Sequence, residues 1–148
     1  MDKNRFLIEL AQSRRTDFGR VAFAGQGEEQ RVFSAIWAME SEVNNGGFSQ
    51  YFFNSDGETA EFAPVALRRF GADRCAKIVE EASRALTSGE VPEDQSERQR
   101  LLDGLGDEAE SCFEPFDDAF YGYPDDLTDL LFEFVKAHPN VFGQIGEA

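Results

Sequence analysis

Apolar residues recur at helical spacing in the first third of the chain. Phe6, Leu7 and Leu10 predict an amphipathic helix over residues 3–13. Positions 32, 36, 39 and 43 are all apolar and form one row, which Phe33 and Trp37 widen into a broad arc. So wide an apolar arc predicts a heavily buried central helix from about residue 28 to residue 43.

The run that follows this central helix predicts a break in the chain direction. Asn44, Asn45, Gly46 and Gly47 tolerate left-handed backbone geometry, so the helix is expected to end there. Residues 48–53 are mostly aromatic and predict a short second helix, which the turn-forming run Asn-Ser-Asp-Gly at 54–57 closes.

Further helices are predicted beyond residue 60. Pro64 suits the first turn of a helix that ends at Phe70, just before a glycine. Asp73 is expected to cap a helix that runs to about residue 86. Pairs of opposite charge four residues apart, 73 with 77 and 80 with 84, are expected to support that helix.

Three expectations concern the last third of the chain. Ser96 is expected to cap a helix that carries three leucines. The apolar row from 109 to 123 keeps the helical period across Pro115, which falls on the opposite, solvent side where a kink is easily accommodated. Asp125 is expected to cap a final helix that ends before Pro139.

These patterns define the predicted fold class. The sequence contains no convincing alternation of period two and no internal repeat. A chain of 148 residues is long enough to build one hydrophobic core. The prediction is therefore an all-α protein with a single compact domain, residues 1–148, of about seven or eight helices.

The charge balance excludes several kinds of ligand. The chain has 29 Asp and Glu against 14 Lys and Arg, a formal net charge of −15. Phosphates would repel such a protein, so direct binding to nucleic acid or to an anionic membrane is not expected, whereas basic partners are. The polar N-terminus does not resemble a signal peptide, and no apolar run approaches the roughly 18 residues that span a bilayer. A cytoplasmic location is expected.

The negative charge is concentrated near the C-terminus. Residues 101–148 hold twelve acids and one base, and residues 103–133 hold eleven acids and no base. On a continuous helix, 31 residues would span about 46 Å, or one charge per roughly 4 Å, against about 3.4 Å per charge on one DNA strand. Helical spacing aligns most of these acids, and the predicted partner-binding surface consists of Asp107, Glu110, Glu114, Asp117, Asp118, Asp125, Asp126, Asp129 and Glu133.

Catalytic and metal-binding patterns are scarce in this sequence. The single histidine, His138, is expected to bond the last carbonyls of a helix. The supply of His and Cys is too small for a metal site of that type, so neither a metal nor a cofactor is expected. Glu40 falls inside the apolar arc and is expected to accept hydrogen bonds from the Gly-Gly turn. An enzyme that uses Glu40 or Glu42, in a cleft beside Asn44 and Asn45, is the alternative.

One segment resembles a known family. Residues 42–55, with the sequence EVNNGGFSQYFFNS, closely resemble the signature of a bacterial family of domains of unknown function, and residues 66–78 fit its next block. The resemblance covers roughly residues 28–137. Within the signature, glycines suit a tight turn between helices, aromatic residues suit the core and an asparagine suits a cap; these positions are Asn44, Asn45, Gly46, Gly47, Phe48, Gln50, Phe52 and Asn54.

The resemblance carries implications for function. The family includes a dimeric DNA-mimic protein, which implies an all-helical, negatively charged homodimer that occupies the DNA-binding surface of a basic regulator or nucleoid protein. The acids of the predicted surface come from helical geometry in this sequence and not from the resemblance. An immunity or antitoxin-like protein that neutralises a basic toxin would also need such a surface, and this alternative stays open.

Overall fold

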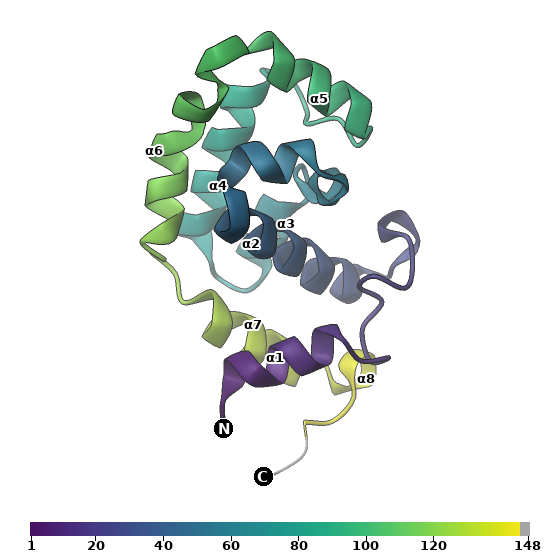
Figure 1. Cartoon of the computed structure of the whole chain (residues 1–148). Coiled ribbons are helices and arrows are strands. Elements are labelled where there is room, and N and C mark those ends of the chain that lie inside the picture. The colour runs from purple at the N-terminus through teal and green to yellow at the C-terminus, as the bar shows by residue number, and fades with distance from the viewer. Residues whose placement is uncertain (146–148) are drawn as a thin grey trace.

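The structure is built entirely from helices. It is a computed structural model that describes residues 1–145, and no strand occurs in that range (Figure 1). The all-α prediction is therefore confirmed. The α-helices are α1 (Lys3–Ala11), α2 (Glu28–Phe53), α3 (Ala63–Arg69), α4 (Asp73–Leu86), α5 (Gln95–Gly104), α6 (Ala109–Tyr121), α7 (Leu127–Lys136) and α8 (Pro139–Phe142). Short 3₁₀ helices are η1 (Phe23–Gly25), η2 (Ser55–Thr59) and η3 (Gly106–Glu108).

Helix α2 lies at the centre of the molecule. It contacts η2, α3, α5 and α6, and α4 packs against α3 and α6 on the far side. The residues predicted to form its apolar row are all fully or almost fully buried. Aromatic rings fill much of this core: Phe52 packs against Phe113 with ring centroids 5.5 Å apart, and Phe48 packs edge-on against Phe120 at 6.1 Å.

A sharp kink divides α2 into two segments. Gly46 has φ −158° and ψ 21°, and Gly47 has φ +75° and ψ −177°, so the helical backbone is interrupted at both residues. The predicted break between two helices is thus confirmed, although the second helix follows directly and without a loop. A positive φ is strained for residues with a Cβ atom, so the break requires a glycine at position 47.

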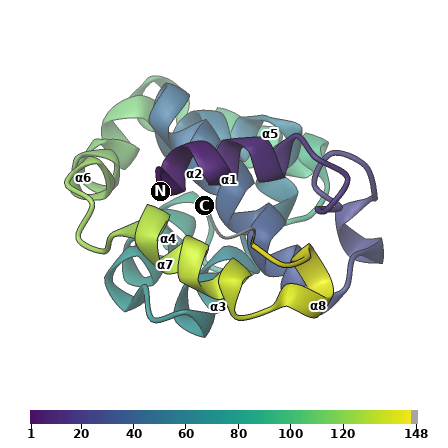
Figure 2. The same cartoon turned by 90° about the horizontal axis from the view of Figure 1, so that it is seen from below.

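Helices α1 and α7 lie side by side at one end of the molecule, as both views show (Figures 1 and 2). The edge of the Phe6 ring meets Phe132 with centroids 5.5 Å apart. Helix α7 contacts α1 and α8, whereas α6 contacts α2 and α4. The helices α6 and α7, which carry most of the predicted acidic residues, therefore pack against different neighbours.

Three predicted caps are wrong by one or two residues. Asp73 is the first residue of α4, and Ala72 holds the cap position. Asp94, not Ser96, caps α5 by accepting from the Glu97 N–H. Asp126, not Asp125, caps α7. For α5 and α7 the shift has one cause, since a capping oxygen must lie where it can reach an N–H about three residues further on. Helix α4 has no side-chain cap at its own cap position.

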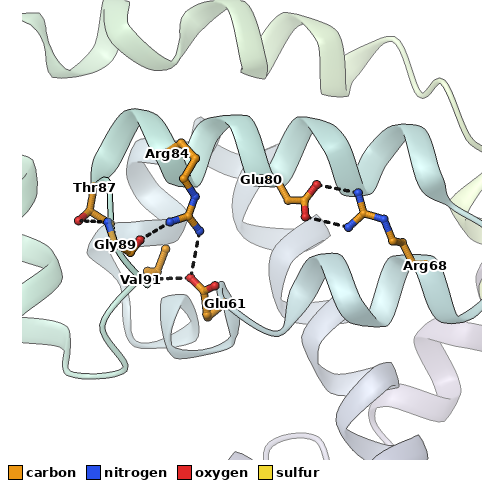
Figure 3. A network of polar contacts seen from close by, with 7 residues as sticks. All are labelled: Glu61, Arg68, Glu80, Arg84, Thr87, Gly89 and Val91. Atoms are coloured by element: carbon orange, nitrogen blue, oxygen red, sulfur yellow. Dashed lines mark hydrogen bonds and ion pairs between the residues drawn. The ribbon is translucent and has the colours of Figure 1, made fainter.

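Polar side chains join α3 and α4 on the outer surface (Figure 3). Arg68 donates two hydrogen bonds to Glu80, at 2.8 and 2.6 Å. Glu61 accepts from Arg84 at 3.3 Å and from the Val91 N–H at 2.7 Å. Neither expected pair along α4 forms an ion pair in the described residues. In the second pair, Glu80 bonds to Arg68 and Arg84 bonds to Glu61 instead.

Candidate protein-binding surface

The predicted acidic residues have three different environments in the structure. One group projects into solvent from the segment of η3 and α6, with no ion pair and no side-chain hydrogen bond to any residue of 1–145. We call this group the α6 acidic surface; it consists of Asp107, Glu110, Glu114 and Asp118. The segment follows one edge of the molecule (Figure 1).

Asp117 faces inward from the same helix. Its Oδ1 accepts a hydrogen bond from the Phe48 N–H at 2.8 Å, so it caps the second segment of α2. Partial burial raises the pKa of the Asp117 carboxyl, although the bond from Phe48 opposes this, and the charges of Asp118 and Glu114 raise it further. Asp117 is therefore part of the scaffold that fixes α6 against the kink.

Two more acids of the predicted surface are helix caps. Asp126 accepts from the Asp129 N–H at 3.1 Å at the start of α7. Asp125 accepts from the Cys75 N–H at 2.8 Å and so satisfies the start of α4, whose own cap position is an alanine. Carboxylates at helix N-termini stabilise the positive end of the helix dipole, so these charges have an internal role.

The remaining two acids form ion pairs with Lys3. Asp129 is its hydrogen-bonded partner, and the Glu133 carboxylate lies 3.8 Å from the Lys3 ammonium. These pairs join α7 to α1, which lie next to each other in Figure 2. The basic residue that compensates this cluster is remote in sequence and could not be recognised from the charge pattern.

The acids of residues 103–133 do not lie on one continuous helix. The chain turns between α6 and α7, and the two helices pack against different neighbours. The uncompensated charges of α6 itself, at 110, 114 and 118, span about 12 Å, or one per roughly 6 Å of helix axis.

Two further acids lie beside the α6 acidic surface. Glu108, in η3, and Asp103, near the end of α5, are both exposed, and neither forms an ion pair with any residue of 1–145. Asp103 was missed because it lies on a different helix, which a single helical wheel does not include. The surface is thus a cluster from three consecutive elements instead of one straight stripe.

Two tyrosines attach the end of α6 to α2. Tyr121 donates to the Val43 carbonyl at 2.8 Å. Tyr123 donates to Glu40 at 2.8 Å and accepts from Asn44 at 2.6 Å. Tyr123 has φ 47°, a left-handed conformation for a residue with a Cβ atom, and its hydrogen bonds hold it there. These bonds fix the position of α6 next to the kink.

Glu40 has a different partner from the one expected. Its carboxylate accepts from Tyr123, not from the N–H groups of the Gly-Gly turn. Burial raises the pKa of Glu40, while the Tyr123 bond lowers it. Burial and the neighbouring Glu40 charge raise the pKa of the Tyr123 hydroxyl to about 12, with Asn44 opposing the shift. An open cavity of about 250 Å³ adjoins Glu40, Asn44 and Tyr123.

The other carboxylate of the enzyme alternative is engaged elsewhere. Glu42 accepts from Gln50 at 3.4 Å and from Asn54 at 2.7 Å, which links the two segments of α2 across the kink. Neither Glu42 nor Asn45 lines the cavity beside Glu40. Asn54 occupies the C-cap position of α2, but its side chain makes the bond to Glu42 and does not cap the helix. The predicted cleft containing all these groups is not formed.

The fold and the surface define a class of protein: a single all-helical domain with a cluster of uncompensated carboxylates along one helical edge. A family model described as DMP19-like protein matches residues 26–138, more than half of the chain. The chain therefore belongs to the DMP19-like protein family. No curated protein and no solved structure matches it. No helix within residues 1–145 is both long and apolar enough to cross a membrane.

Proposed function

We propose that this protein binds a basic DNA-binding protein through the α6 acidic surface and competes with DNA for that partner. DMP19, after which the family is named, is a DNA mimic protein. A mimic needs carboxylates that are exposed, fixed in position and not already neutralised. The α6 acidic surface meets all three requirements.

The ion-pair pattern is the observation that carries this proposal. Within residues 1–145 every ion pair uses an acid outside the stretch 103–126. The acids of that stretch either cap helices or project into solvent. An ordinary solvated helix intersperses both signs, because like charges four residues apart destabilise it. A surface that keeps one sign attracts a partner of the opposite sign.

A competition experiment tests the proposal. The immobilised protein is incubated with native lysate at about 50 mM NaCl, where surface charges are weakly screened, and eluted at about 0.5 M. We expect a basic protein that binds duplex DNA by itself and that added DNA displaces from the column. A captured protein that does not bind DNA would contradict mimicry, and a basic toxin would favour the immunity alternative.

Two double variants distinguish an effect of the α6 acidic surface on binding from an effect of the total charge. Glu114→Gln with Asp118→Asn removes two charges from the α6 acidic surface. Glu81→Gln with Glu90→Gln removes two exposed charges elsewhere, outside every ion pair of residues 1–145. We expect the first variant to bind the captured partner about tenfold more weakly and the second to bind nearly as the parent does. Equal effects of the two variants would place the binding site elsewhere.

A further inference from the structure

An open groove of about 920 Å³ lies next to the α6 acidic surface. The second segment of α2 forms one wall, through Gln50, Phe53 and Asn54. The end of α5, η3 and the start of α6 form the other wall, through Asp103, Asp107 and Glu110. These elements occupy the upper part of Figure 1. No basic residue lines the groove.

The α2 wall presents hydrogen-bond acceptors. A carboxylate can only accept, so the amide nitrogens of Gln50 and Asn54 must face Glu42, as they do at 3.4 and 2.7 Å. The two amide oxygens, Oε1 and Oδ1, accept no hydrogen bond from any residue of 1–145. With the carboxylates opposite, both walls of the groove offer acceptors to a ligand that carries donors.

Phe53 adds an aromatic ring to the same groove. Phe53 is 52% exposed, whereas the other phenylalanines are buried in the core or packed against it. Its carbonyl accepts from Gln95 at 3.0 Å and from Gln99 at 3.1 Å, so α5 holds the backbone at this end of α2. These bonds fix the backbone position from which the Phe53 ring projects at the groove.

We propose that this groove binds an arginine side chain presented by the basic partner; the inference rests on the proposed function. A guanidinium group has five donors, no acceptor, a positive charge and a flat face. The donors match the carboxylates and amide oxygens, and the flat face stacks on an exposed aromatic ring such as Phe53. Lysine offers the same charge without the planar group and is bound more weakly.

Peptide titration tests this inference directly. Acetylated hexa-arginine and hexa-lysine, which carry equal charge, are titrated into the isotope-labelled protein at low salt and followed by amide chemical shifts. We expect hexa-arginine to move the signals of Gln50, Phe53 and Glu110 and to bind about threefold more tightly than hexa-lysine.

Two variants isolate the contributions to the groove. Phe53→Leu keeps the apolar contact area and loses the ring, so we expect the preference for arginine to disappear while hexa-lysine binds as before. Asp103→Asn with Asp107→Asn is expected to weaken both peptides about tenfold. The variant Glu81→Gln with Glu90→Gln, which has the same loss of charge, is expected to have little effect. Circular dichroism checks that each variant retains its helices.

The outcomes distinguish the groove from the proposed function. If the peptides move only the signals of Glu114 and Asp118, with equal affinity, the groove inference is wrong and the acidic surface stands. If a DNA-displaceable partner is captured and Phe53→Leu binds it unchanged, the same conclusion holds. Groove signals that shift with protein concentration alone would assign the groove to a second copy of the chain and overturn the inference.

Discussion

Arg98 is a fully buried cation whose partners are all backbone carbonyls. It donates to the carbonyls of Phe52 and Asn54, each at 2.8 Å, and to that of Glu93 at 2.6 Å. The carbonyls at a helix C-terminus have no partners within the helix and carry partial negative charge. Arg98 therefore caps α2 from another helix. Burial lowers the pKa of its guanidinium group, and the nearby Tyr51, Glu58 and Asp94 oppose the shift.

Replacing Arg98 tests this capping role. Arg98→Met keeps much of the apolar stem but leaves several buried carbonyls without donors, so we expect the free energy of unfolding to fall by about 3 kcal/mol. Urea denaturation measures the change. Arg100→Met, at an exposed position on the same helix, is the control and should change stability by less than about 0.5 kcal/mol. Similar small effects at both positions would contradict the role given to Arg98.

Glu40 predicts a dependence of stability on pH. Its pKa in the folded protein is raised, mainly by burial, so folding favours the protonated form. Its contribution to stability is therefore complete below its ordinary pKa and is lost as the pH rises through the raised value. Glu40→Gln retains an acceptor for Tyr123 without the charge, and we expect it to stabilise the protein near about pH 7 and not near about pH 4.

The measurement is the urea midpoint of both proteins across this pH range. Removing any acid from so negative a protein reduces repulsion, so Glu81→Gln, at an exposed position of α4, corrects for that general effect. A stabilisation by Glu40→Gln no larger than the one by Glu81→Gln would show that burial of Glu40 has no such consequence.

At the scale of elements, the kink in α2 depends on Gly47. A Cβ atom there would lie 2.6 Å from Asp117 Oδ2, and φ is +75°. Gly47→Ala is thus expected to destabilise the protein by about 2–3 kcal/mol in urea denaturation, through backbone strain and displacement of the Asp117 cap. Gly104→Ala, near the end of α5, is the comparison, since Gly104 has no positive φ and a Cβ atom there meets nothing within 4 Å. Equal losses would mean that the left-handed geometry is not the cause.

Elements were predictable where a local pattern determines them. The apolar row of α2, the break at its glycines and the exposed Pro115 in α6 all follow from residues close in sequence. Contacts that join distant segments could not be predicted in this way. Asp125 caps α4 across fifty residues, and Lys3 compensates Asp129 from the other end of the chain. Helical periodicity placed the acids on helix faces, but it does not show which carboxylates already form a cap or an ion pair.

At the scale of the whole molecule, the net charge of −15 separates into distinct populations. Part of it is compensated by ion pairs on α1, α3 and α4, and part stabilises helix N-termini. The rest is exposed, either on the α6 acidic surface or at scattered positions such as Glu81 and Glu90. The carboxylates of the α6 acidic surface are neighbours along one helical edge, so their fields add there. Binding through this surface is therefore expected to weaken steeply with salt, whereas the fold is held mainly by its aromatic core.

Asp118 is expected to destabilise α6, so its replacement tests whether the charge serves binding and not folding. It lies near the C-terminus of α6, where a negative charge interacts unfavourably with the helix dipole, and four residues after Glu114. We expect Glu114→Gln with Asp118→Asn to raise the free energy of unfolding by about 0.5–1 kcal/mol at low salt, and by less as salt screens the repulsion. Urea denaturation at several NaCl concentrations measures this.

The same double variant is expected to bind the partner more weakly, so stability and binding should change in opposite directions. Selection for stability alone would remove these two charges, and a surface that retains them at a cost to the fold is explained by its partner. If the variant instead unfolds more easily, the carboxylates stabilise α6 in its own right. Stabilisation of α6 would then explain these carboxylates without a binding partner. The uncompensated charge would no longer support the proposed function, whereas the family assignment would be unaffected.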